Sequence, residues 1–156
     1  MSETWLKWRA PSARAVGVGS MARHTLLWHK RSYDGSGKAD CFYTGNQEQE
    51  VFGVVFEIDD EEKCWLDSAE GLGKGYEEKK AYIANTAGET WEAYVYVASK
   101  SHIEDLLSPY PWYKRFVVEG AKAHNLPSWY IANLEAVVAT EDSDVKRAAK
   151  YSKFAC

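Results

Sequence analysis

The chain has 156 residues and a formal net charge of −4, and 46% of its residues are hydrophobic and 14% aromatic. This size and composition predict one domain over residues 1–156 with a sizeable apolar core, and no apolar run approaches the roughly 20 residues that cross a bilayer, so no membrane partner is expected. Acidic and basic residues are interspersed without a long run of Lys or Arg, which argues against a nucleic-acid partner.

The first third of the chain predicts a short helix followed by strands. Residues 2–9 are compatible with one or two helical turns, with Ser2 as the cap. Residues 15–19 and 24–30 are short β-compatible runs, and a cluster of turn residues at 34–37 follows the second run.

Residues 51–58 form a nearly continuous apolar run, which predicts a central strand covered on both faces. A helix over residues 60–70 should follow, because apolar side chains recur there at helical spacing. Asp59 and Glu62 have the spacing of a capping box at the start of this helix.

Glu70 ends the predicted helix directly before a glycine-rich turn. A carboxylate there faces the negative end of the helix dipole, and Asp67 adds like-charge repulsion, so both effects disfavour its ionised form. Lys74 would partly cancel them. A carboxyl group balanced in this way suits proton transfer near neutral pH. The alternative is that Glu70 only caps a surface helix in the acid-rich segment that begins at 59–62.

Residues 76–84 and 90–98 predict a β-hairpin through the turn residues at 85–88. Alternation in the second strand places Tyr94 and Tyr96 on one face and apolar side chains on the other. The turn before the hairpin contains Gly71, Gly73 and Gly75. This spacing imitates a phosphate-binding loop, but no helix start follows it, so a turn into a strand is favoured.

The remainder of the chain predicts helices. Pro111 should open one helix and Asn125 should end it in the left-handed conformation. Pro127 should begin the next helix, and an amphipathic stretch over about residues 142–154 should form the last one. Strands early in the chain and helices late in it predict a mixed α+β domain.

Cysteine and histidine usage limits other kinds of site. Cys41, Cys64 and Cys156 are odd in number and widely spaced, which is typical of reduced thiols. The N-terminus lacks the pattern of a secretory signal, so a cytoplasmic location is expected. The four histidines have no spacing that places two of them with an acid on one helix face, so no metal site is expected.

A set of short motifs between residues 10 and 138 resembles the gamma-glutamylcyclotransferase (AIG2-like) family in order and spacing. They are Pro11-Ser12-Ala13-Arg14, Trp28-His29-Lys30-Arg31-Ser32, Gly35-Ser36-Gly37-Lys38-Ala39, Val51-Phe52-Gly53-Val54-Val55-Phe56, Leu66-Asp67, Glu70-Gly71, Gly75-Tyr76, Tyr94, Tyr113-Lys114, Gly120-Ala121-Lys122 and Asn125-Leu126-Pro127. The resemblance implies a small mixed-sheet β-barrel flanked by helices.

The resemblance also implies site residues. In that family the glutamate at the position of Glu70 is the catalytic acid/base, and the tyrosines at the positions of Tyr76, Tyr94 and Tyr113 line the substrate pocket. Without the resemblance, core packing with a satisfied hydroxyl would explain these tyrosines equally well. The implied reaction converts a γ-glutamyl amino acid or amine into 5-oxoproline and a free amine.

The chemistry of this reaction explains the choice of residue. A γ-glutamyl amide carries its own nucleophile, the α-amine, so closing the lactam requires neither metal nor organic cofactor. The amine must lose a proton and the departing amine must gain one, and a single carboxylic acid such as Glu70 can do both. Acid/base catalysis contributes about 10²- to 10⁴-fold and near-attack positioning a comparable factor, so the pocket must also fix the substrate α-carboxylate.

The N-terminus departs from the family pattern. Members begin with an apolar strand leading into Tyr-Gly-Ser-Asn, whose backbone amides hold the glutamyl moiety, and this segment does not occur in the sequence. We expect that the chain starts at an internal methionine and lacks that strand and loop. An unpaired sheet edge would then permit homo-oligomers. A second function also stays open, a catalytically silent binding or interaction module on the same fold.

Overall fold

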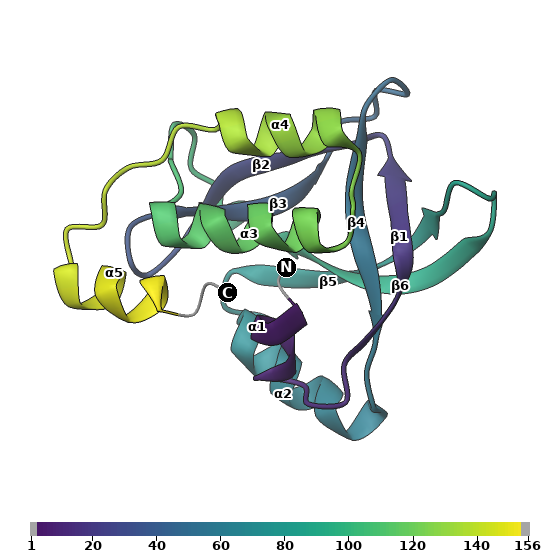
Figure 1. Ribbon diagram of the computed structural model, residues 1–156, viewed down its shortest axis with the longest axis horizontal. Coiled ribbons are helices and arrows are strands. Elements are labelled where there is room, and N and C mark those ends of the chain that lie inside the picture. Colours follow the sequence, from purple (N-terminus) through teal and green to yellow (C-terminus); the bar gives the residue numbers. More distant parts are fainter. Residues whose placement is uncertain (1–2, 154–156) are drawn as a thin grey trace.

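The computed structural model describes residues 3–153 (Figure 1). The strands are β1 Arg14–Ala22, β2 His24–Arg31, β3 Gly37–Tyr43, β4 Glu50–Glu57, β5 Tyr76–Ala84 and β6 Thr90–Ala98. The helices are α1 Glu3–Lys7, α2 Lys63–Glu70, α3 Pro111–Ala123, α4 Ser128–Ala136 and α5 Val145–Ser152, with short 3-10 turns η1 Asp60–Glu62 and η2 Lys100–His102. No helix within 3–153 is both long and apolar enough to span a membrane. The predicted cap Ser2, Cys156 and the end of the last predicted helix lie outside the described residues.

The strands form two antiparallel sheets that curl toward each other. One sheet has the order β4-β1-β5-β6, and the other is the β2-β3 ribbon. Strand β3 lies against β6, and β2 lies against β4, so the ribbon bridges the two edges of the larger sheet. The predicted α+β class with flanking helices is confirmed. The described strands do not close into one hydrogen-bonded barrel, because no ladder joins β3 to β6 or β2 to β4.

Helices α3 and α4 lie side by side across one face of the curled sheet (Figure 1). Pro111 is the first residue of α3, and Asn125 adopts a φ of 53° just after that helix, as predicted. The main core cluster lies between these helices and strands β1, β2 and β4. Its buried members are Val118, Ala121, Leu126, Tyr130 and Leu134. This packing fixes the position of α3 over the ribbon.

Helices α1 and α2 pack together at the other end of the sheet, around buried Leu6, Ala10 and Ala13. The predicted capping box at Asp59 and Glu62 does not form, and η1 precedes α2. The Glu62 carboxylate instead accepts hydrogen bonds from the Ser12 amide at 3.0 Å and its hydroxyl at 2.6 Å. The contact between Ser12 and Glu62, which are fifty positions apart in the sequence, therefore replaces the local cap and connects the loop after α1 to the start of α2.

Candidate active site

Glu70 is the last residue of α2, and the glycine-rich turn after it leads directly into β5. Gly71 ends the helix with φ 76°, and Gly73 and Gly75 also have positive φ, so this segment is a turn, as predicted, and not a phosphate loop. The Tyr76 amide donates back to the Gly71 carbonyl. This tight return places the start of β5 beside the end of α2.

The Glu70 side chain is largely buried, with 15% of its surface exposed. Its Oε1 accepts a hydrogen bond from Arg9 Nη1 at 2.5 Å, and Arg9 is itself 22% exposed. Within residues 3–153, Oε2 has no hydrogen-bond partner. Glu70 is therefore not a solvent-exposed cap. Its carboxylate is held by one oxygen and leaves the other available.

Asp67 does not act on Glu70 as expected from the sequence. It binds Lys63 one turn earlier and accepts a 2.5 Å hydrogen bond from the Tyr96 hydroxyl. Lys63 also pairs with Glu78. The expected like-charge repulsion is thus neutralised by Lys63, and Arg9 balances the Glu70 carboxylate.

Tyr76 and Tyr113 meet at one backbone residue, Ala39 of β3. The Tyr76 hydroxyl donates to the Ala39 carbonyl at 2.9 Å, and the Tyr113 hydroxyl accepts from the Ala39 amide at 3.1 Å. Burial raises the pKa of Tyr113 to about 12, with a smaller contribution from the Glu70 carboxylate. Burial, Tyr113 and Glu70 together raise the pKa of Tyr76 well above its usual range. The structure therefore brings Glu70, Tyr76 and Tyr113 together, with both tyrosines protonated.

Tyr94 is not part of this group. Its side chain is on the outer side of β6, 53% exposed, with Lys63 Nζ 5.3 Å and Lys80 Nζ 5.7 Å from its ring centroid. Tyr96 shares the predicted face with Tyr94 and contacts α2 through Asp67 and Lys63. The structure thus separates Tyr94 from Glu70, Tyr76 and Tyr113.

Lys30, at the end of β2, belongs to the site although nothing in the sequence marked it as a site residue. It is 7% exposed, and its Nζ lies 4.6 Å from the Tyr76 ring centroid. A bulge between Leu27 and Lys30 breaks the strand alternation, so that His29 and Lys30 are both buried. Burial lowers the pKa of Lys30, and the Glu70 and Asp34 carboxylates partly oppose this. The only available signal was its place in the motif Trp28-His29-Lys30-Arg31-Ser32, which the resemblance includes without giving Lys30 a role.

His29 itself is occupied in a buried contact. Its Nε2 lies 2.8 Å from Asp40 Oδ2, and the other oxygen of Asp40 accepts from the Ala98 amide at 2.7 Å. This pair joins β3 to the end of β6, across one of the two seams without a ladder. We assign it a structural role.

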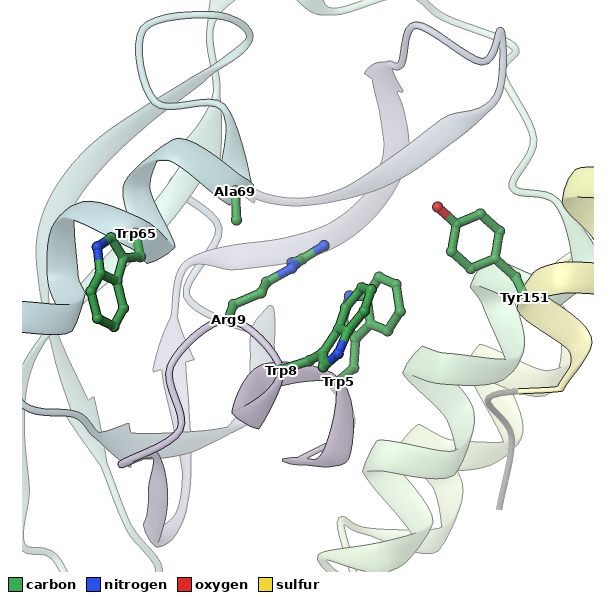
Figure 2. Close-up of a pocket in the computed structure, with 6 residues that line it drawn as sticks. All are labelled: Trp5, Trp8, Arg9, Trp65, Ala69 and Tyr151. Carbon is green, nitrogen blue, oxygen red and sulfur yellow. The ribbon is translucent and has the colours of Figure 1, made fainter.

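A pocket of about 550 Å³ opens beside Arg9, between α1, α2 and α5 (Figure 2). It is lined by Trp5, Trp8, Arg9, Trp65, Ala69 and Tyr151. Figure 2 shows the Arg9 side chain extending between Ala69 and the side chains of Trp5 and Trp8. Since Arg9 also contacts Glu70, the aromatic pocket lies next to the candidate acid.

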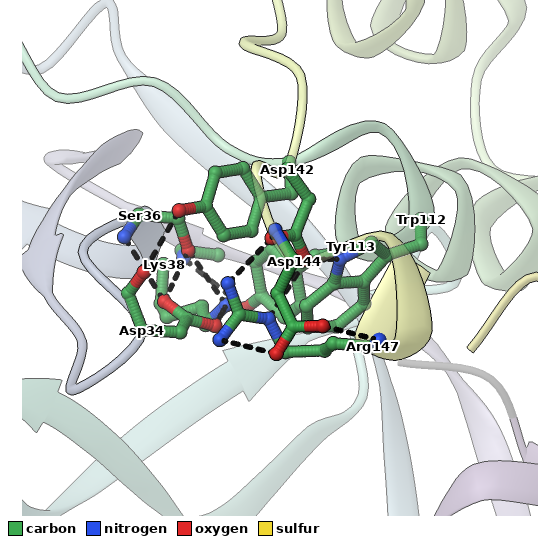
Figure 3. Close-up of polar contacts among 10 residues, drawn as sticks. Asp34, Ser36, Lys38, Trp112, Tyr113, Asp142, Asp144 and Arg147 are labelled. Carbon is green, nitrogen blue, oxygen red and sulfur yellow. Dashed lines mark hydrogen bonds and ion pairs between the residues drawn. The ribbon is translucent and has the colours of Figure 1, made fainter. Parts of the chain in front are cut away.

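A second polar network lies around Lys38, next to the Tyr113 ring (Figure 3). Lys38 Nζ is 2.8 Å from Asp34 Oδ2 and 4.5 Å from the ring centroids of both Trp112 and Tyr113. The network continues to α5, where Arg147 pairs with the buried Asp142 and Asp142 accepts from the Trp112 indole at 2.9 Å. Every cation of this network has a carboxylate partner.

The geometry supports proton transfer by a carboxylate in a partly closed, cation-rich site. Glu70 can accept or donate a proton at Oε2, Arg9 fixes its orientation, and Tyr76 and Tyr113 supply neutral hydroxyl groups nearby. Within the described residues no three His, Cys, Asp or Glu side chains gather as a metal site would require. Glu70, Arg9 and the two tyrosines together suit acid/base chemistry on a bound molecule.

Comparisons with known proteins agree with this fold. The model of the AIG2-like family matches residues 50–134, more than half of the chain, whereas curated protein sequences gave no match. Among solved structures, one named gamma-glutamyl cyclotransferase is similar with a TM-score of 0.84 at 23% identity, over 97% of this chain and 92% of that chain. An uncharacterized protein from Homo sapiens has a TM-score of 0.79 at 24% identity, over 94% and 90% of the two chains. YkqA from Bacillus subtilis has a TM-score of 0.70 at 14% identity, over 88% of this chain and 50% of that chain.

Proposed function

This chain belongs to the AIG2-like family, and from that premise we propose that it is a gamma-glutamyl cyclotransferase. It converts a γ-glutamyl amino acid or amine into 5-oxoproline and releases the free amine. The α-amine nitrogen of the substrate attacks the γ-carbonyl carbon, the new carbon–nitrogen bond closes the lactam, and the old amide bond breaks. Neither water nor an oxidant is consumed.

Glu70 moves the protons that this reaction requires. Its free Oε2 takes one proton from the α-ammonium group, and the resulting carboxylic acid returns it to the nitrogen of the departing amine. The ring nitrogen loses a second proton as the lactam forms, and Glu70, ionised again, takes it and passes it to the released amine, which leaves as an ammonium ion. Arg9 holds Oε1 during both steps, which keeps the carboxylate in one orientation. The observation that carries the proposal is this largely buried carboxylate beside two protonated tyrosines.

The aromatic pocket suits the amine part of the substrate. It is next to Arg9, and therefore next to the acid that must protonate the departing nitrogen. Tryptophan and tyrosine rings offer a large apolar contact area and also attract cations. We therefore assign the departing amine to this pocket and the glutamyl moiety to the side of Glu70 that faces Tyr76.

The test compares two acids of one helix. The wild type, Glu70→Gln and Asp67→Asn are incubated with several γ-glutamyl amides, and 5-oxoproline is measured by chromatography. Glu70→Gln should lower turnover by about 100-fold or more, because it removes the proton carrier. Asp67→Asn removes the same charge from α2 without touching the site and should keep turnover. Equal turnover by the wild type and Glu70→Gln excludes Glu70 as the acid/base.

The silent binding module is the second candidate function. It is favoured by the Arg9–Glu70 ion pair, which already satisfies part of the carboxylate, and by the sequence, which contains no Tyr-Gly-Ser-Asn. Calorimetry with γ-glutamyl amides distinguishes the two functions. Binding without any 5-oxoproline supports the module, and turnover rejects it.

A further inference from the structure

The candidate site holds more positive than negative charge close to Glu70. Arg9 pairs with Glu70, but Lys30 has no hydrogen bond or ion pair to any side chain in the part of the chain that the structure describes. Its neighbours include the Tyr76 ring and the backbone at Gly75. Lys30 is thus a buried cation without a matched anion.

Leaving this cation buried carries a cost in stability. A buried charge without a partner loses its hydration without a compensating contact. In addition, Lys30 lies directly opposite Lys38 in the β2-β3 register, and like charges in such a pair repel each other. The β2 bulge directs Lys30 into this position. Such a costly arrangement is expected where a ligand supplies the missing charge.

The chemistry of the substrate identifies the missing charge. In a γ-glutamyl amide, the α-amine and the α-carboxylate are attached to the same carbon atom. When the amine reaches Glu70, the carboxylate must therefore lie within a few ångströms of Glu70. Lys30 lies over the Tyr76 ring and against Gly75, at the end of the turn that begins directly after Glu70, so the two groups share one site.

We propose that the Lys30 ammonium group binds the α-carboxylate of the γ-glutamyl substrate, and so places the α-amine against Glu70; this inference rests on the proposed function. Arg9 is the weaker candidate, because its guanidinium already bonds the acid. Gly75 also fits this role for Lys30, since a Cβ there would lie 3.0 Å from Lys30 Cε and crowd the ammonium group.

The test is a cycle that pairs a protein change with a substrate change. Wild type and Lys30→Met are each assayed with a γ-glutamyl amide and with the same compound as its α-carboxamide. The wild type should lose about 10- to 100-fold in kcat/KM when the carboxylate is replaced, as for a hydrogen bond between charged groups. On the carboxylate substrate, kcat/KM of Lys30→Met should be lower than that of the wild type by a similar factor. On the carboxamide, the two proteins should have the same kcat/KM. Equal losses on both substrates overturn the proposal.

Two further variants control this cycle. Lys38→Met removes the other buried lysine and should keep the wild-type preference for the carboxylate, whereas Lys30→Arg should restore part of it. Arg9→Met is tested in the same cycle. If the preference for the carboxylate in kcat/KM disappears in Arg9→Met and stays in Lys30→Met, the contact belongs to Arg9 and the proposal is overturned. If Lys30→Met does not fold, Lys30→Gln takes its place in the cycle.

Binding of 5-oxoproline and of its carboxamide, measured by calorimetry, separates the two proposals. A carboxylate preference that disappears in Lys30→Met, in a protein without turnover, supports Lys30 and rejects the cyclotransferase. Turnover by Lys30→Met with an unchanged preference for the carboxylate supports the cyclotransferase and rejects Lys30 as the ligand of the carboxylate.

Discussion

Lys30, which is buried, and Lys38, whose side chain is largely buried, face each other across the β2-β3 ribbon, yet their surroundings differ. Lys38 has a carboxylate at 2.8 Å and two aromatic rings, within a network that continues to α5 (Figure 3). Lys30 has one aromatic ring and no carboxylate in contact, among residues 3–153. Matched charges hold a fold together, whereas an unmatched charge at the same depth indicates a site that awaits a ligand. The comparison thus separates a structural region from a functional one.

Replacing each lysine by methionine should shift stability in opposite directions. Lys38→Met leaves the largely buried Asp34 without its ion pair and should lower Tm by about 10 °C. Lys30→Met removes a buried charge without a partner and should raise Tm by a few degrees. Thermal unfolding of both variants in the absence of ligand measures this difference. A lower Tm for Lys30→Met as well would mean that Lys30 has a structural role.

Asp142 should matter for stability and not for turnover. Asp142→Ala leaves Arg147 and the Trp112 indole without their partner and should lower Tm by about 5 to 10 °C. Turnover per folded molecule should be unchanged at low temperature. A loss of turnover in fully folded Asp142→Ala would instead connect the network to the candidate site.

The pH dependence of stability should report the ionisation of the Asp142 carboxylate. The Arg147 guanidinium, opposed by desolvation and aided by the Trp112 indole, lowers the pKa of Asp142 from 3.8 to about 2. Because this pKa is depressed on folding, the stabilisation is complete above pH 3.8 and is lost as the pH falls toward 2. Acid titrations followed by circular dichroism should show a shallower loss for Asp142→Ala than for the wild type.

Tyr76→Phe should give the smallest effect. It removes the hydroxyl that donates to the Ala39 carbonyl and should cost about 1 kcal/mol of unfolding free energy, as for one neutral hydrogen bond. Chemical denaturation measures this cost. The exposed Tyr82→Phe is the matched control and should leave stability unchanged. A cost well above that of a single hydrogen bond would mean that Tyr76 also organises the Lys30 side of the site.

The sequence predicted the elements that depend on local signals. The hairpin of residues 76–84 and 90–98, the helix start at Pro111 and the left-handed stop at Asn125 all follow from turn and capping residues close to them in the chain. The family resemblance was also confirmed, because the AIG2-like match includes the segment around Glu70.

The partners of the site residues could not be predicted in the same way. Arg9 meets Glu70 across 61 positions of sequence, and this contact depends on how α1 packs against α2. Lys30 is turned inward by a bulge, which the alternation of a regular strand does not anticipate. Alternation did assign the correct common face to Tyr94 and Tyr96, but Tyr94 pairs with Lys80, four residues along β5 from Tyr76, and so lies away from Glu70.

Helix α5 gives the aromatic pocket one of its walls while contributing nothing to the acid. Tyr151 lines that pocket and stacks on Trp112 at 4.4 Å, and α5 is attached to the rest of the domain through Arg147 and Asp142. Under the proposed function, one wall of the amine pocket therefore lies on a segment separate from the proton-transfer residues. Evolution or an engineer can exchange the terminal helix to change which amine is accepted, while the proton-transfer residues keep their sequence.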